Sequence, residues 1–355
     1  MIDGGWQKYQ GNYEFRPEAF TDPKAMFDKI NGMGFKTLLW VGPFVAPDSA
    51  EYRDLKSKGL LIMRKSRKSP GILHWWSGYS AAYDLTKPEA VESLKGTLRD
   101  MQKKYGMHGF KFDAGDTKFV VGDFKFNKPG QIPVDYTHEW SKFALDFPYN
   151  EFRANARMGG QPVVLRLQDK HHTWKDLRQI IPDMLAAGIM GYPYTCPDMI
   201  GGGDYVSFQP GAELDEKLIV RSCQVHALMP MMQFSVAPWR VLSKKNMEIC
   251  RKFAQLHEKF GPYILELARN ASKTGEPIVR YMEYEFPNQG FENCKDQFML
   301  GPKYLVAPII TEADEREVMI PAGEWKDDLG NVVKGPATIK VSAPIERLPY
   351  FEKIK

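Results

Sequence analysis

The sequence lacks most of the features that identify metal-binding, nucleotide-binding and membrane-spanning proteins. No stretch reaches about 18 apolar residues, so no segment is expected to cross a membrane. No Gly-x-Gly-x-x-Gly follows an apolar run, which argues against a dinucleotide-dependent oxidoreductase. Cysteines are few, and none forms a Cys-x-x-Cys pair or stands at zinc spacing from a histidine: they are Cys196, Cys223, Cys250 and Cys294. We therefore expect neither a metal nor an organic cofactor.

A strong charge of one sign is also missing. The formal net charge is +4 over 355 residues, and no five consecutive residues are basic. The densest basic segment, Arg64-Lys65-Ser66-Arg67-Lys68, is more typical of a solvated surface loop than of a nucleic-acid contact. We therefore expect a neutral partner and no nucleic acid.

What the sequence does contain is a repeated alternation of short apolar runs and amphipathic stretches. The stretch 88–105 shows the pattern best, because Pro88 suits the first turn of a helix and Gly106 suits the residue after its end. The same reasoning predicts helices at 24–33, 174–187, 213–227 and 244–273, with Gly34 and Gly188 as stops. It predicts strands at 35–41, 108–113, 161–167, 189–194 and 229–234.

This alternation is typical of a parallel sheet covered by helices on both faces. The unusual polar and aromatic residues follow the strands, which is the pattern of a (β/α)8 barrel with its site at the carboxyl ends of the strands. They are Asp113, Asp169, Asp198 and Trp239. An open doubly wound sheet would fit the alternation as well. From about residue 274 the runs become short and β-rich, at 279–285, 297–300, 304–310 and 317–320. We expect a barrel over residues 1–273 and a small antiparallel β-sandwich domain over 274–355.

Asp113 is the first candidate for chemistry. It ends the apolar run Gly109-Phe110-Lys111-Phe112 and is followed by the small residues Ala114 and Gly115. A carboxylate in that position, with room for a substrate to approach, suits a nucleophile that attacks an anomeric carbon. An aspartate that caps the next helix would give the same pattern.

Asp169 is the second candidate, at the end of Arg166-Leu167-Gln168-Asp169. A retaining glycosidase needs a second carboxyl group about 5 to 5.5 Å from its nucleophile, to act first as acid and then as base. Arg166 would bind sugar hydroxyls or tune the carboxylate. A simple surface salt bridge between Arg166 and Asp169 remains the alternative.

Two further motifs resemble a metal site and a phosphate-binding loop, but neither is complete. His171 and His172 have no partners at metal-ligand spacing, so exposed or supporting histidines are expected. The glycine-rich segment 197–203 lacks the Lys-Ser/Thr of a phosphate-binding loop, and we expect a tight loop at the mouth of the barrel.

Together these motifs make the chain resemble glycoside hydrolase family 31, and within it the branch of myogenesis-regulating glycosidases. The resemblance extends from Ile2 to about Phe351. Lys111-Phe112-Asp113-Ala114-Gly115 resembles the nucleophile motif of the family, and Asp169, with Trp174 five residues on, resembles its acid/base segment. The resemblance implies a retaining α-glycoside hydrolase, with Asp113 as nucleophile and Asp169 as acid/base, that acts on an oligosaccharide or glycoside.

The same resemblance implies a set of substrate-binding residues. Asp198 is similar to the aspartate of a family loop, and Arg157 falls where the family places an active-site arginine. The full implied set is Asp3, Trp40, Trp75, Trp76, Lys111, Arg157, Arg166, Asp198 and Trp239. For the tryptophans, packing in the core is an equally good interpretation.

The chain departs from the family in two respects. Where most α-glucosidases of the family have Arg-x-His, it has Gln233-Phe234-Ser235, and Arg166 replaces a usual tryptophan. These changes argue against glucose specificity, and the resemblance to the branch associated with α-galactosides implies galactose, with glucose as the other option, as the terminal sugar. Relatives also carry a β-sandwich domain and the first barrel strand or strands before this point. We therefore expect a barrel without its first strands, from a fragment of a longer product or a shortened homologue. A carbohydrate-binding or regulatory homologue without turnover is the alternative function.

Overall fold

The computed structural model describes residues 1–66 and 68–355, so Arg67 of the basic segment lies outside the described residues. The chain divides into two compact units, Met1–Leu165 and Arg166–Lys355, and each is considered by itself. Within the described residues, no helix is both long and apolar enough to cross a membrane.

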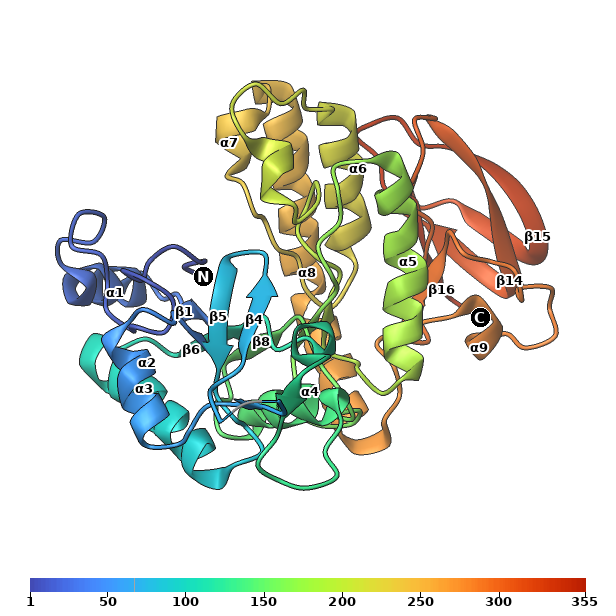
Figure 1. The fold of residues 1–355 in the computed structure, drawn as a ribbon. Coiled ribbons are helices and arrows are strands. Elements are labelled where there is room, and N and C mark those ends of the chain that lie inside the picture. The colour runs from blue at the N-terminus through green and yellow to red at the C-terminus, as the bar shows by residue number, and fades with distance from the viewer. Residues whose placement is uncertain (67) are drawn as a thin grey trace. The chain divides into compact units, whose positions relative to one another are not determined.

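The first unit contains a parallel sheet of short, buried strands (Figure 1). Its strands are β1 (Leu38–Val41), β6 (Gly109–Phe112) and β8 (Asn150–Phe152), in that order. The register places Trp40 beside Lys111, and Phe152 beside Leu165 of β9 (Leu165–Arg166). Ile2 forms a parallel bridge to Leu39 on the other side of β1. All four residues of β6 are buried, including the charged Lys111 between two phenylalanines.

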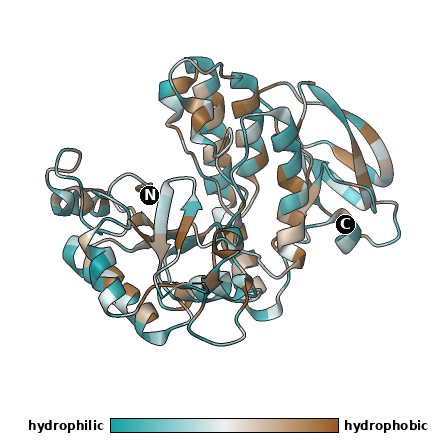
Figure 2. Ribbon diagram, in the orientation of Figure 1, coloured by the Kyte–Doolittle hydropathy of each residue, from teal (hydrophilic) through white to brown (hydrophobic). Residues whose placement is uncertain are grey.

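Helices surround these strands: α1 (Pro23–Gly32), α2 (Ala50–Ser57), α3 (Pro88–Tyr105) and α4 (Pro133–Ser141), with the 3-10 turns η1 (Thr117–Val120) and η2 (Lys142–Leu145). The prediction for α3 is confirmed at both ends, because Gly106 adopts the left-handed conformation that closes the helix. Its buried residues recur every three or four positions: Ala90, Leu94, Leu98, Met101 and Tyr105. Figure 2 shows the mixed hydropathy expected of a helix with one buried side.

Two small antiparallel sheets complete the first unit. One joins β2 (Phe44–Val45), β5 (Gly78–Ala82) and β4 (Ile72–Trp75) in that order, and the other pairs β3 (Met63–Arg64) with β7 (Phe124–Lys125). The β4–β5 hairpin stands out in Figure 1 as two light-blue strands.

The second unit begins with Arg166 of β9, and α5 (Trp174–Ile189) and β10 (Thr195–Cys196) follow along the chain. In the sheet, β10 lies next to β9. The predicted strand 189–194 is wrong, because α5 continues through Ile189 and only Thr195–Cys196 are extended. Gly188 is not a helix stop. A Cβ there would approach the Pro277 side chain and the Val279 carbonyl at 3.0 and 3.1 Å, so this glycine permits close packing. The left-handed glycine that follows the helix is Gly191.

The remaining helical elements are η3 (Tyr205–Phe208), α6 (Glu216–Ala227), α7 (Pro238–Val241) and α8 (Lys244–Thr274). The predicted strand 229–234 is also wrong, since only a single bridge joins Phe234 to Ile200. Both α6 and α8 contribute to a large apolar core, whose members include Val220, Cys223 and Phe253.

A six-stranded antiparallel sheet ends the chain. Its strands run in the order β11 (Val279–Arg280), β12 (Phe298–Leu300), β13 (Tyr304–Val306), β16 (Tyr350–Lys353), β14 (Glu315–Asp327) and β15 (Val332–Ser342). The prediction that this region consists mainly of β-strands is confirmed, with two corrections. The stretch 279–285 becomes helical at α9 (Met282–Glu285), and β14 is far longer than the predicted strand 317–320. The division into 1–273 and 274–355 stays a prediction.

Candidate active site

Asp113 lies directly after β6, where the chain turns sharply. Its amide donates to the Val41 carbonyl at 2.8 Å, which continues the pairing of β6 with β1. Ala114 and Gly115 then both adopt positive φ, at 56° and 73°. A Cβ on Gly115 would lie 2.3 Å from Trp140 Cδ1, so only glycine fits. Asp113 does not cap a helix, because η1 begins at Thr117 after Asp116.

The Asp113 carboxylate is fixed by donors on both oxygens. Trp40 Nε1 donates to Oδ2 at 2.7 Å, while Arg153 Nε and the Ala114 amide each donate to Oδ1 at 2.8 Å. Asp113 is 7% exposed. Donors of this kind stabilise the ionised carboxylate and hold it in one orientation, as a nucleophile requires.

Arg153 is a residue that the sequence interpretation missed. It follows β8, and its guanidinium also donates to both oxygens of Asp116, at 2.9 and 2.6 Å. Burial lowers the pKa of Arg153, but the charges and hydrogen bonds of Asp113 and Asp116 outweigh that effect and raise the pKa overall. Its position directly after a parallel strand was the signal that could have identified it.

Arg157, the arginine implied by the family resemblance, lies four residues further on. It donates to Asp135 Oδ1 at 2.5 Å, and its side chain is largely exposed. Backbone hydrogen bonding from Ile132, followed by Arg157, lowers the pKa of Asp135. A role for Arg157 in binding substrate stays a prediction.

Trp40, which donates to Asp113, belongs to a cluster of three tryptophans. Trp40 and Trp75 stack with ring centroids 6.4 Å apart and planes 12° apart, and Trp75 meets Trp76 at 4.8 Å. Trp75 is buried and donates to Ser80 Oγ, which is a packing role. Trp76 is 55% exposed and lies 4.8 Å from the Arg153 guanidinium, so one of its faces remains open.

Lys111 and Asp3 form a separate pair in the first unit. Lys111, on β6, is almost fully buried, and its Nζ donates to Asp3 Oδ2 at 2.8 Å. The Asp3 side chain is largely exposed. The pair therefore presents a carboxylate whose orientation is set from the sheet beneath it.

In the second unit, Arg166 joins Asp169 and Asp198. Its side chain is 1% exposed, and Nη1 donates to Asp169 Oδ1 at 2.5 Å and Asp198 Oδ1 at 2.8 Å. The ion pair that was the alternative interpretation of Arg166 and Asp169 is present, although its arginine is buried rather than superficial, and the acid/base role of Asp169 stays a prediction. The Asp169 side chain is 46% exposed and thus open to solvent.

Asp198 is fully buried beneath a tight glycine loop, as predicted for residues 197–203. The amides of Lys170 and Gly203 donate to Oδ2 at 2.8 and 3.0 Å. Burial raises the pKa of Asp198 to about 6, and the charge of Arg166 partly opposes this rise. A Cβ on Gly203 would lie 2.6 Å from Asp198 Oδ1 and 3.0 Å from Asp169 Oδ1, so this glycine lets the loop approach both carboxylates.

Trp239 and His171 are exposed, whereas His172 is partly buried. Trp239, on α7, is 74% exposed and available to a ligand. His171 Nδ1 lies 2.9 Å from Asp204 Oδ2, while His172 Nε2 accepts from the Asp215 amide at 3.0 Å. Across residues 1–66 and 68–355, no group of three or more His, Cys, Asp or Glu side chains is arranged to hold a metal.

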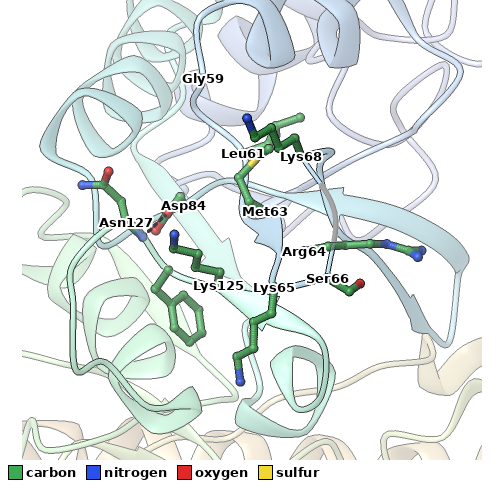
Figure 3. Close-up of a pocket in the computed structure, with 11 residues that line it drawn as sticks. Gly59, Leu61, Met63, Arg64, Lys65, Ser66, Lys68, Asp84, Lys125 and Asn127 are labelled. Carbon is green, nitrogen blue, oxygen red and sulfur yellow. Dashed lines mark hydrogen bonds between the residues drawn. The ribbon is translucent and has the colours of Figure 1, made fainter.

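A cavity of about 730 Å³ in the first unit is distinct from the Asp113 cluster (Figure 3). It is lined by basic side chains such as Lys65 and Lys125, but in the figure Arg64 and Lys65 point in different directions. Its carboxylate, Asp84, already accepts hydrogen bonds from Thr86 and from the Asn127 amide. The cavity includes neither Asp113 nor a tryptophan, and we do not assign the chemistry to it.

Parallel strands followed by carboxylates that arginine or tryptophan supports are the arrangement of a (β/α) barrel protein with its site at the carboxyl ends of the strands. A model of the glycosyl hydrolases family 31 TIM-barrel domain matches residues 1–267, and one of the family 31 C-terminal domain matches 275–354. The chain belongs to glycoside hydrolase family 31. Its predicted fold class, barrel strands and helices followed by an antiparallel β-domain, is confirmed.

Among proteins with curated descriptions, the myogenesis-regulating glycosidase of Mus musculus is 32% identical over 99% of this chain and 51% of its own length. An alpha-xylosidase of Saccharolobus solfataricus is 24% identical over 98% of this chain and 49% of its own. The chain thus spans about half the length of these relatives.

Solved structures agree on the fold. A family 31 dextranase of Flavobacterium johnsoniae, complexed with glucose, superposes with a TM-score of 0.86 at 25% identity, over 99% of this chain and 47% of its own. A cycloalternan-forming enzyme of Listeria monocytogenes, in complex with a pentasaccharide substrate, superposes with a TM-score of 0.82 at 26% identity, over 94% of this chain and 34% of its own.

Proposed function

We propose that the protein is a retaining α-glycoside hydrolase in which Asp113 is the nucleophile. A carboxylate oxygen of Asp113 attacks the anomeric carbon, the glycosidic bond breaks, and Asp169 protonates the departing oxygen. Asp169 then removes a proton from water, which attacks the glycosyl-enzyme and restores Asp113. The observation that carries the proposal is the fixation of the Asp113 carboxylate by Trp40 Nε1 and Arg153 Nε.

Asp169 suits the acid/base role because its side chain is accessible to a leaving oxygen and then to water. Its neighbour Arg166 lies within hydrogen-bond distance and is itself anchored by Asp198. The proposal requires Asp113 and Asp169 to stand about 5 to 5.5 Å apart when substrate is bound.

For the sugar, we favour a terminal α-linked galactose over glucose. Arg166 stands where the family commonly has tryptophan, and Gln233-Phe234-Ser235 replaces Arg-x-His. In this proposal the exposed side chains of Asp3, Trp76, Arg157 and Trp239 contact the sugar. The buried Lys111 and Arg166 orient the carboxylates of Asp3 and Asp169, and Asp198 anchors Arg166.

The test is hydrolysis of p-nitrophenyl α-galactoside, α-glucoside, α-xyloside and α-N-acetylgalactosaminide by the purified chain. Release from one of them, abolished in Asp113→Asn, is expected. A 2-deoxy-2-fluoro analogue of the accepted sugar should leave a covalent adduct that peptide mass mapping places on Asp113. In Asp169→Ala, azide should restore turnover and yield the α-glycosyl azide. An adduct on another residue would refute the assignment.

A sugar-binding protein without turnover is the second candidate, and the Arg166–Asp169 ion pair favours it. Asp169 Oδ1 accepts a hydrogen bond from Arg166 Nη1, whereas the first step needs this carboxyl group to donate to the leaving oxygen. This candidate predicts calorimetric binding of a monosaccharide by the folded chain with no aglycone release. Any release that Asp113→Asn abolishes would contradict it.

A further inference from the structure

The basic segment found in the sequence lies at the edge of a cavity in the first unit. Its described residues, Arg64, Lys65, Ser66 and Lys68, line the cavity of about 730 Å³ shown in Figure 3. The Arg64 amide donates to the Ser69 carbonyl at 3.0 Å, and β3, which ends at Arg64, pairs with β7. The segment therefore stands on a short antiparallel pair of strands.

The cavity has an excess of positive charge. Among the described residues that line it, four are cationic and one, Asp84, is acidic, so the formal excess is three on a chain whose net charge is +4. Asp84 is 3% exposed, and its oxygens accept from the Thr86 amide and hydroxyl and from the Asn127 amide. That carboxylate is therefore already engaged within the first unit. The four cationic residues are Arg64, Lys65, Lys68 and Lys125.

These four cations lack carboxylate partners. Within residues 1–66 and 68–355, none of them forms an ion pair. Asp123 precedes β7, but it accepts from the amide of Ser66 at 3.0 Å and from its hydroxyl. The Ser66 hydroxyl is the main cause that lowers the pKa of Asp123, and the charge of Arg64 adds to it. Uncompensated like charges repel one another and raise the potential of the cavity, which favours an anion there.

The cationic side chains are free to adapt to such an anion. Lys65, Lys68 and Lys125 are exposed, and exposed side chains change rotamer within picoseconds to nanoseconds. Arg64 and Lys65 point apart in Figure 3, as expected of like charges. Both types of side chain bind phosphate well, arginine through two parallel hydrogen bonds and lysine as a compact charge.

The rest of the lining sets the size and character of the ligand. The cavity volume is within the range of pockets that bind small molecules. Leu61 and Phe126, 2% and 8% exposed, and Met63 add an apolar wall. We propose that this cavity binds a small phosphate monoester, whose phosphate group meets the cations and whose organic part meets the apolar wall. The site is separate from Asp113 and does not depend on the hydrolase function.

The test is calorimetric titration of the purified chain at low salt with phenyl phosphate, inorganic phosphate and benzyl alcohol. None of the three is a sugar, so none competes for a glycosidase site. Phenyl phosphate should bind more tightly than inorganic phosphate, and benzyl alcohol should not bind measurably. The double variant Lys65→Gln/Lys125→Gln should weaken binding of phenyl phosphate by about tenfold, through the loss of two solvent-screened charge contacts.

The matched control is Lys36→Gln/Lys295→Gln, which removes two exposed lysines outside the cavity lining and changes the net charge equally. It should leave the affinity for phenyl phosphate unchanged. Equal losses in both double variants would show an effect of overall charge and overturn the site. Inorganic phosphate that binds as tightly as phenyl phosphate would overturn the monoester in favour of the free ion, and absence of binding by either would overturn the proposal altogether.

A second measurement guards against misfolding as the cause of lost binding. Lys65→Gln/Lys125→Gln removes repulsion between exposed like charges, so its free energy of unfolding in urea should equal or exceed that of the unaltered chain. A clear decrease would contradict the argument from uncompensated charge. Failure of the hydrolase proposal would leave all of these results unaffected.

Discussion

Replacement of Arg153 by methionine would test the construction of the Asp113 cluster most directly. The change keeps an unbranched apolar stem and removes a guanidinium that donates three hydrogen bonds, one to Asp113 and two to Asp116. Both carboxylates and the arginine are largely buried. The variant therefore leaves two negative charges with less compensation, and it frees one side of the proposed nucleophile.

The expected magnitudes follow from these contacts. A hydrogen bond to a charged group contributes about 1.5 to 3 kcal/mol, so loss of the Arg153–Asp113 contact should lower kcat/KM by about 10- to 150-fold. Removing one partner of a buried ion pair costs about 3 kcal/mol or more in the free energy of unfolding. Steady-state kinetics on the accepted p-nitrophenyl α-glycoside and urea unfolding would measure the two effects.

Arg157→Met is the matched control, since it removes the arginine that the family resemblance implied. The Arg157–Asp135 pair is largely exposed on the arginine side and should contribute no more than about 1 kcal/mol to stability. Kinetics would then decide between the two arginines. If Arg157→Met lost more activity than Arg153→Met, the reasoning from the contacts of Asp113 would be refuted, and the resemblance would be the better guide.

Three further predictions concern stability. Burial raises the pKa of Asp198 to about 6, so the folded state binds this proton more tightly than the unfolded state does. The contribution of Asp198 to the free energy of unfolding should thus fall by about 2 kcal/mol between pH 4 and pH 7, and the free energy of unfolding of Asp198→Asn in urea should lack this pH dependence. Gly115→Ala should destabilise the chain by about 2 to 4 kcal/mol in the same assay, through strain at φ 73° and overlap with a tryptophan ring. Gly130→Ala, with φ 78° but open space, should cost only about 1 kcal/mol, and equal losses would show that the overlap is relieved. Arg221→Met removes a buried guanidinium that donates to Asp314 and to the Ala313 and Ala343 carbonyls, and it should lower the free energy of unfolding by about 3 kcal/mol. The control Arg251→Met, on the surface, should change it by less than about 1 kcal/mol. Similar values for both variants would contradict the argument from burial.

The sequence predicted the structure best where the type of a single residue determines the local backbone conformation. Pro88 and Gly106 mark the two ends of α3, because each residue suits one helix end for reasons that need no tertiary contact. Gly188 misled for the opposite reason. Its lack of a side chain serves a close approach to Pro277, and such a contact between segments far apart in sequence leaves no local signal.

The candidate site divides in the same way. Asp113 was recognisable because a polar residue interrupts an apolar run, and a buried strand makes that interruption conspicuous. Arg153 was missed although it directly follows a strand, because β8 is only three residues long and its Asn-Glu-Phe sequence has no apolar run that would mark a strand end. The side chains that hold a carboxylate are specified by packing between strands, which a single sequence does not reveal.

Backbone strain provides a pointer to the site that is independent of the family. Five non-glycine residues among the described ones have left-handed φ: Tyr13, Ala114, Arg157, Asp198 and Asn288. Such conformations cost free energy and persist where surrounding contacts enforce them, often at functional sites. Ala114 follows the proposed nucleophile directly, and Asp198 shares Arg166 with the proposed acid/base. In each unit, a left-handed residue and an arginine therefore lie beside a carboxylate: Ala114 and Arg153 beside Asp113 in the first unit, and Asp198 and Arg166 in the second. The surrounding hydrogen bonds that fix these carboxylates also enforce the strained backbone.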